Sequence, residues 1–187
     1  MIGSTLIIGL GGPRGDAQAA WRLADAVGWQ LAALNELRDE QVLLSQNPAE
    51  MLPWLHGVVR LVIFDSCAPG EAPIAGGKPL EVGQAARFLW PVSGLHSRHN
   101  CGDGDGTITK VLANAEQLNR LPAHVWIWTI ATEEAAESDS LSLSLSPTIE
   151  AALPDVVRRV SRELTALIAC AEEALPGAEE CRPSAVP

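Results

Sequence analysis

Two strand-like runs of this chain each end at an acid that could bind a ligand. The apolar run Leu6–Leu10 enters a turn of glycines and one proline that closes on Asp16. The β-branched run Val58–Phe64 stops at Asp65. In a doubly wound α/β protein, strand ends of this kind lie at the carboxyl edge of the sheet, where ligands bind. The sequence therefore predicts a site at that edge, with carboxylates from two separate segments.

Each of these candidate groups also has a structural explanation. Asp16 would cap the helix that follows it, where its charge meets the positive end of the helix dipole. Asp65 would accept hydrogen bonds from nearby backbone N–H groups. His96 and His99 lie in the least regular stretch, residues 83–105, where a histidine needs no ligand. The sequence alone leaves both interpretations open.

The elements that must position these groups follow from the spacing of the apolar residues. We expect a single three-layer α/β domain, with a mostly parallel sheet of about five strands and helices on both faces. Strands are expected over residues 6–10, 41–45, 58–64, 78–82 and 125–130. Helices are expected over residues 17–34, from 48 onward, over 107–118, and from 147, where Pro154 should bend or restart the helix. The domain should cover residues 1–174, and residues 175–187 should form a disordered tail.

Composition excludes several classes of partner. The 13 Lys and Arg against 23 Asp and Glu give a net charge of −10, so phosphate backbones are repelled and nucleic acid is not expected. No apolar run approaches the roughly 20 residues that span a bilayer, so no membrane partner is expected. The first residues lack the basic stretch of a signal peptide. We therefore expect a cytoplasmic protein with free cysteines.

Three weaker motifs do not indicate a nucleotide site, a calcium site or a reactive cysteine. Gly9 and Gly11 begin a pattern like the dinucleotide fingerprint, but Arg14 stands where the third glycine belongs, so no nucleotide cofactor is expected. The Gly/Asp run at residues 102–106 lacks the Gly and Glu that a calcium loop needs. Cys67 and Cys101 are lone cysteines, which usually act as small apolar residues.

Four segments, taken in order, resemble the hydrogenase maturation endopeptidases, which trim the carboxyl-terminal tail from the large subunit of nickel-iron hydrogenases. They are the glycine turn with Arg14–Asp16, the strand Leu61–Asp65, the segment Leu112–Ala115 and the segment Leu145–Pro154. The resemblance runs from Leu6 to about Leu167. It implies an endopeptidase that acts on a hydrogenase large-subunit precursor after nickel insertion.

The resemblance also implies a set of metal ligands. In this family the second of two adjacent acids, an Asp ending a strand, and a His before the third helix hold the nickel of the substrate or another divalent metal. The strand-end Asp corresponds to Asp65 and the first acid of the pair to Asp16, but the second falls on Ala17, whose methyl group binds no cation. The expected ligands are Asp16, re-aimed by a shorter turn, Asp65, and His99 or else His96. No catalytic residue is implied.

Two functions remain open at this stage. The first is the endopeptidase, and the second is a non-catalytic relative that binds a hydrogenase subunit or an assembly factor as a maturation scaffold. Ala17 at an acid position, and Gly12 where the family has Asn, favour the scaffold. A re-aimed Asp16 favours the endopeptidase, which ranks first.

Overall fold

A computed structural model describes residues 4–33, 40–69, 79–91, 107–133 and 143–173 of the chain. The strands are β1 (Ser4–Leu10), β2 (Glu40–Ser45), β3 (Val58–Cys67), β4 (Ala85–Leu89) and β5 (His124–Ala131). The α-helices are α1 (Ala19–Ala33), α2 (Ile108–Gln117) and α3 (Pro147–Glu173). Two 3₁₀ helices, η1 (Gly15–Gln18) and η2 (Pro48–Leu55), complete the described elements.

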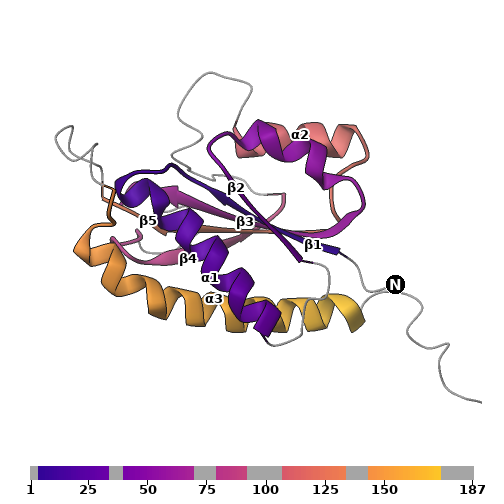
Figure 1. Cartoon of the computed structure of the whole chain (residues 1–187). Helices are drawn as coiled ribbons and strands as arrows, with labels where there is room; N and C mark the ends of the chain where they lie inside the picture. The colour runs from indigo at the N-terminus through magenta and orange to yellow at the C-terminus, as the bar shows by residue number, and fades with distance from the viewer. Residues whose placement is uncertain (1–3, 34–39, 70–78, 92–106, 134–142, 174–187) are drawn as a thin grey trace, which may run out of the picture.

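The strands form one sheet in the order β2-β1-β3-β5-β4. The first four strands of that order are parallel, and β4 pairs antiparallel with β5 at the edge. Helices α1 and α3 pack on one face, whereas α2 and η2 cover the other (Figure 1). The predicted three-layer α/β fold with a mostly parallel sheet of five strands is therefore confirmed. The predicted domain boundary at 174 and the predicted tail, residues 175–187, lie at or beyond the last described residue.

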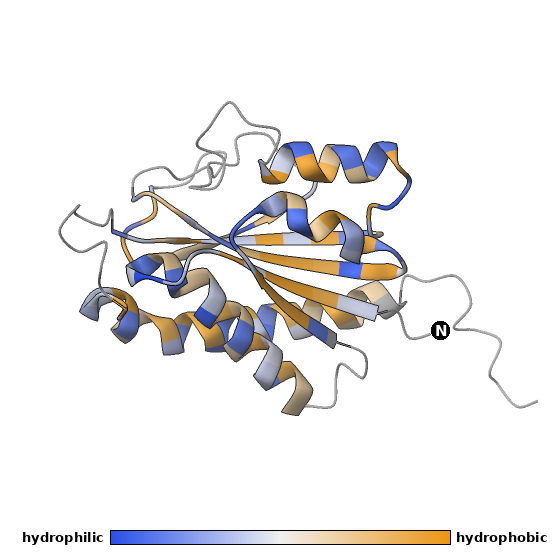
Figure 2. Ribbon diagram, turned by 45° about the horizontal axis from the view of Figure 1, so that its top comes forward, coloured by the Kyte–Doolittle hydropathy of each residue, from blue (hydrophilic) through white to orange (hydrophobic). Residues whose placement is uncertain are grey.

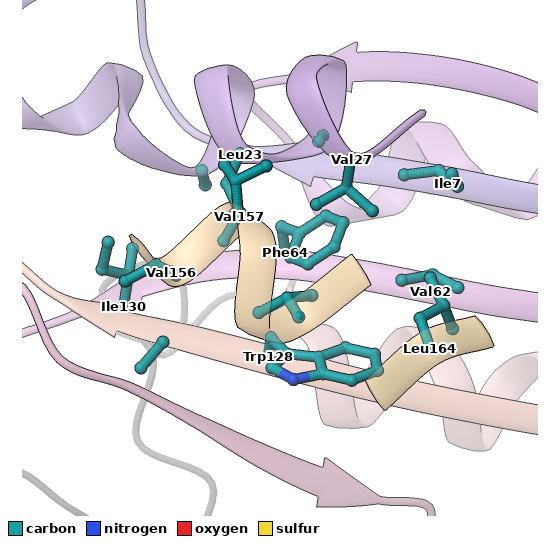
Figure 3. Packing of buried hydrophobic residues seen from close by; sticks show 14 of the residues in the cluster. Ile7, Leu23, Val27, Val62, Phe64, Trp128, Ile130, Val156, Val157 and Leu164 are labelled. Atoms are coloured by element: carbon teal, nitrogen blue, oxygen red, sulfur yellow. The ribbon is translucent and has the colours of Figure 1, made fainter. Parts of the chain in front are cut away.

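The central strands are apolar on both faces because both faces are covered. Toward α1 and α3, the rings of Phe64 and Trp128 lie 5.8 Å apart between centroids, and Leu23 and Val157 pack beside them (Figure 3). Toward α2, the alternate residues of the same strands form a second apolar core. Apolar colour accordingly fills the strands, while polar residues gather on the outer surfaces of the helices (Figure 2).

The fourth strand differs from the prediction. Residues 79–82 form no strand, and β4 lies instead at Ala85–Leu89. Gly83, with φ of +84°, turns the chain, and hydrogen bonds between residues 83–84 and Ala131 then dock it antiparallel on β5. Because β4 is an edge strand, alternate residues such as Arg87 stay exposed, which hides the apolar signal that marks the central strands.

The helices also differ in detail. Helix α1 begins at Ala19, after the 3₁₀ turn η1, so the predicted start at residue 17 was two residues early. Helix α3 runs through Pro154 without restarting. Core contacts on both sides of the proline, from Ile149 to Val156, hold the helix together. Within the described ranges, no helix is both long enough and apolar enough to cross a membrane.

Candidate functional site at the carboxyl edge

Asp65 lies inside β3, two residues before the strand ends, and is fully buried. Its strand neighbours Ile63 and Cys67 belong to the core beneath α2. Because side chains alternate along a strand, Asp65 projects toward that same face. Its Oδ1 accepts a hydrogen bond from the N–H of Ser66 at 2.8 Å, so the expected backbone contact is confirmed. The prediction that the strand ends at Phe64, before the segment Asp65–Cys67, was three residues short, because those residues still pair with β5.

The sheet register sets Asp65 beside a second buried polar residue. Asp65 pairs with Thr129 of β5, and Thr129 pairs in turn with Ala86 of β4. Thr129 is fully buried, and its Oγ1 has no hydrogen-bond partner among the described residues. The preceding row across the sheet is apolar throughout: Ile63, Ile127 and Phe88. Sequence analysis missed Thr129, although a lone polar residue inside the run Trp126–Ala131 was a signal for it.

Asp16 lies in η1 and is directed to the start of α3. Its Oδ1 accepts the backbone N–H of Ser146 at 2.7 Å, and its Oδ2 accepts the hydroxyl of Ser146 at 2.8 Å. The Ser146 Oγ also accepts the N–H of Ile149, in the first turn of α3, at 3.4 Å. The expectation that Asp16 caps the helix after it was therefore wrong. The N-cap position of η1 is Arg14, whose side chain makes no capping bond.

A second hydrogen bond ties η1 to the segment before α3. The Nε2 of Gln18 donates to the backbone carbonyl of Leu143 at 2.7 Å. Asp16 and Gln18 are both buried, at 7% and 8% exposed. Together they fix the chain that leads into α3 against the turn after β1.

The glycine turn after β1 is shaped by helix packing. A Cβ at Gly11 would lie 2.3 Å from the carbonyl oxygen of Ala17, and a Cβ at Gly9 would lie 3.0 Å from that of Ala20. The N–H of Gly12 donates to the same Ala17 carbonyl at 2.9 Å, and that of Gly11 donates to Ser45. These glycines therefore let α1 and η1 approach the end of β1, while the Gly11 and Gly12 N–H groups bond to β2 and η1.

The other positions of the predicted metal-ligand set are Ala17, His96 and His99. Ala17, at the position where the resemblance expects an acid, is half-buried in this turn. His96 and His99 lie outside the described residues. Within the described part of the chain, no three His, Cys, Asp or Glu side chains gather as a metal site. The set of Asp16, Asp65 and His99 or His96 thus stays a prediction.

Comparison with known proteins places the fold. No protein-family profile matches the chain, and no curated protein is similar to it in sequence. The hydrogenase maturating endopeptidase HybD from E. coli has a similar structure, with a TM-score of 0.55 at 17% identity, over 91% of this chain and 94% of that one. The endopeptidase HycI from Escherichia coli has a TM-score of 0.51 at 16% identity, over 86% of this chain and 90% of that one. At these identities the comparisons show a shared fold.

Proposed function

We propose that this chain is an endopeptidase that removes the C-terminal extension of a nickel-iron hydrogenase large-subunit precursor after nickel insertion. The observation that carries the proposal is the fold shared with HybD over more than nine-tenths of both chains. The buried carboxylate of Asp65, near the carboxyl edge of that fold, supports it.

In this proposal the nickel is part of the substrate. Asp65 offers one carboxylate, and the described residues gather no complete set of protein ligands. That arrangement suits a cation that arrives with ligands of its own, and another divalent metal of similar preference could replace it. A cation next to the scissile bond polarises its carbonyl, so that addition of water cleaves the peptide. We propose no permanently bound cofactor.

One observation favours the scaffold as a second candidate. The acid position of the resembling family holds the methyl group of Ala17, and both oxygens of Asp16 already accept hydrogen bonds from Ser146. A scaffold would bind the precursor, or an assembly factor, without cutting it. Both candidates predict binding, so cleavage is the property that separates them.

The test is to incubate the purified full chain with nickel-loaded precursor and to weigh the products by intact-mass spectrometry. We expect loss of the C-terminal extension, and no loss from precursor without nickel. Asp65→Asn should slow cleavage about 100-fold, because a charged group that positions the reacting centre is lost. Asp25→Asn, on the exposed side of α1, is the matched control and should cleave normally. Binding with unchanged mass would support the scaffold, and neither binding nor cleavage would refute both.

A further inference from the structure

Four arginines gather where α3 passes along β4, away from the proposed cleavage site. Arg158, Arg159 and Arg162 lie within two turns of α3, and Arg87 lies in β4. All four side chains are exposed. They make up four of the 13 Lys and Arg of the chain, and together they form what we refer to as the arginine strip.

Two contacts set the direction in which α3 crosses β4. At the turn before β4, a Cβ on Gly83 would lie 2.8 Å from the Cβ of Ala152. At the first residue of β4, the Nη2 of Arg159 donates to the carbonyl of Ala85 at 2.7 Å. The helix and the strand therefore advance in the same direction, side by side (Figure 1).

This direction brings Arg87 and Arg162 to the same place. Arg87 follows Ala85 by two residues, and Ala85 packs in the core beneath α3, so Arg87 projects toward the same side of the sheet. Arg162 follows Arg159 by about one helical turn and lies on the same side of α3. The two guanidinium groups therefore border the same stretch of β4.

The charge of the strip is opposite to that of the molecule. Asp155 pairs with Arg158, and Glu163 is the other carboxylate among these residues, so the four arginines keep an excess of positive charge. The whole chain carries a net charge of −10. A positive strip on such a surface attracts a partner that presents carboxylates at this place. The rest of the surface repels a long polyanion such as a nucleic acid.

The backbone of β4 favours an extended polypeptide as that partner. The N–H of Trp90 donates to the carbonyl of Val125 in β5. Because the direction of hydrogen bonding alternates along an antiparallel strand, the N–H and C=O of Leu89 point away from β5, toward the outer edge of the sheet. The side chain of Leu89 is 54% exposed at this edge. A peptide that adds to a strand edge gains affinity from main-chain bonds and specificity from alternate side chains.

We propose that the arginine strip and the edge of β4 bind an extended, acidic stretch of a partner polypeptide. Carboxylates at every second residue of this stretch pair with Arg87 and Arg162, while its backbone bonds to that of Leu89. The surface lies on the α3 side of the sheet, whereas Asp65 projects toward α2. The inference therefore goes beyond the proposed function and does not rest on it.

The experiment titrates a short fluorescent peptide of alternating glutamate and valine with the full chain and measures fluorescence anisotropy. Arg87→Gln and Arg162→Gln should each weaken binding about threefold, as expected for an exposed ion pair, and together about tenfold. Because both side chains are exposed, the melting temperature should not change. Arg120→Gln, beyond the end of α2, removes the same charge from another exposed position and should bind as the wild type does.

Two further probes identify the chemistry of the ligand. A peptide with lysine in place of glutamate should not bind the wild type, but it should bind the double variant Arg87→Glu and Arg162→Glu. The acidic peptide with alternate backbone nitrogens methylated should bind more weakly, because it cannot donate hydrogen bonds to the strand edge.

Three results would overturn the inference. The first is equal affinity of the wild type and the double variant Arg87→Gln and Arg162→Gln for the acidic peptide. The second is no binding of this peptide at millimolar concentration. The third is tighter, arginine-dependent binding of a labelled oligothymidylate, which would assign the strip to single-stranded nucleic acid. Cleavage of the precursor is measured separately by mass, so none of these results decides the proposed function.

Discussion

Asp16 lies in the turn after β1 and Asp65 near the end of β3, and their carboxylates have different roles in the fold. Both oxygens of Asp16 accept hydrogen bonds from Ser146, so its negative charge is used to hold the start of α3. Asp65 is fully buried within β3, and its Oδ1 accepts the backbone N–H of Ser66. Asp16 is therefore suited to a structural role at the start of α3.

Ala17→Asp tests whether the missing acid can be restored. If Asp65 already faces the cation, a second carboxylate should raise nickel affinity at least tenfold, because even outer-shell groups change metal affinity by about 10–100-fold. Calorimetry with nickel chloride measures the change. Ala17→Asn introduces a side chain of nearly the same volume as aspartate but without its charge, and it should bind nickel as the wild type does. Equal affinity for all three proteins would argue that no cation site lies within reach of residue 17.

Gly11→Ala tests the packing explanation of the glycine turn. The added Cβ would lie 2.3 Å from the carbonyl oxygen of Ala17, a backbone atom, so η1 and α1 would have to move. We expect a loss of about 1–3 kcal/mol in the free energy of unfolding, as for other overpacked sites. In Gly12→Ala the nearest atom is the Ala17 Cβ at 3.3 Å, so the loss should be much smaller. Urea denaturation of both variants measures the two free energies of unfolding. Equal losses in Gly11→Ala and Gly12→Ala would contradict the packing explanation.

At the scale of elements, the link between η1 and α3 is the least predictable contact of this edge. The capping signal at Ser146 and Pro147 is local, but nothing in the sequence says that the hydroxyl will be held by an acid 130 positions earlier. The same link explains how a short 3₁₀ turn is fixed next to a 27-residue helix. The buried side chain of Asp16 joins the two elements.

A double-mutant cycle on Asp16→Ala and Ser146→Ala tests this link. Each single variant should lower the free energy of unfolding by about 1–3 kcal/mol, because each removes a hydrogen bond of this part-buried contact to a charged carboxylate. The double variant should lose clearly less than the sum of the two single losses, since the residues share the contact. Chemical denaturation measures all four proteins, and the exposed Asp25→Ala should change stability by less than about 0.5 kcal/mol. Additive losses would show that the contact contributes nothing.

At the scale of the whole molecule, the sequence predicted the layered architecture because burial on both faces marks a strand strongly. The run Val58–Phe64 is apolar except for Arg60, and the residues around Trp128 are apolar except for Thr129. Nearly continuous apolar runs of this kind are typical of parallel strands that are covered on both faces. The long core face of α3 was equally clear. These signals are local, so they could be interpreted without knowing the topology.

The predictions from sequence that were wrong or incomplete concern features that depend on contacts between distant segments. Strand β4 becomes a strand because Gly83 turns the chain onto β5, and its exposed Arg87 masks the pattern. The pairing of Asp65 with Thr129 follows from sheet register, which the sequence does not specify. The sequence placed Asp16 and the glycines in a turn after β1. Their hydrogen-bond partners, Ser146 and Ser45 among them, come from distant segments and could be known only from the folded chain.

The bond between Asp16 and Ser146 also sets an order of events during synthesis. Strand β1 and its turn leave the ribosome well before the partner of Asp16, which lies 130 residues further along. Until Ser146 has been added, Asp16 lacks both the amide and the hydroxyl that it binds in the folded protein. The edge that is proposed to meet the precursor is therefore completed only after residue 146 has left the ribosome.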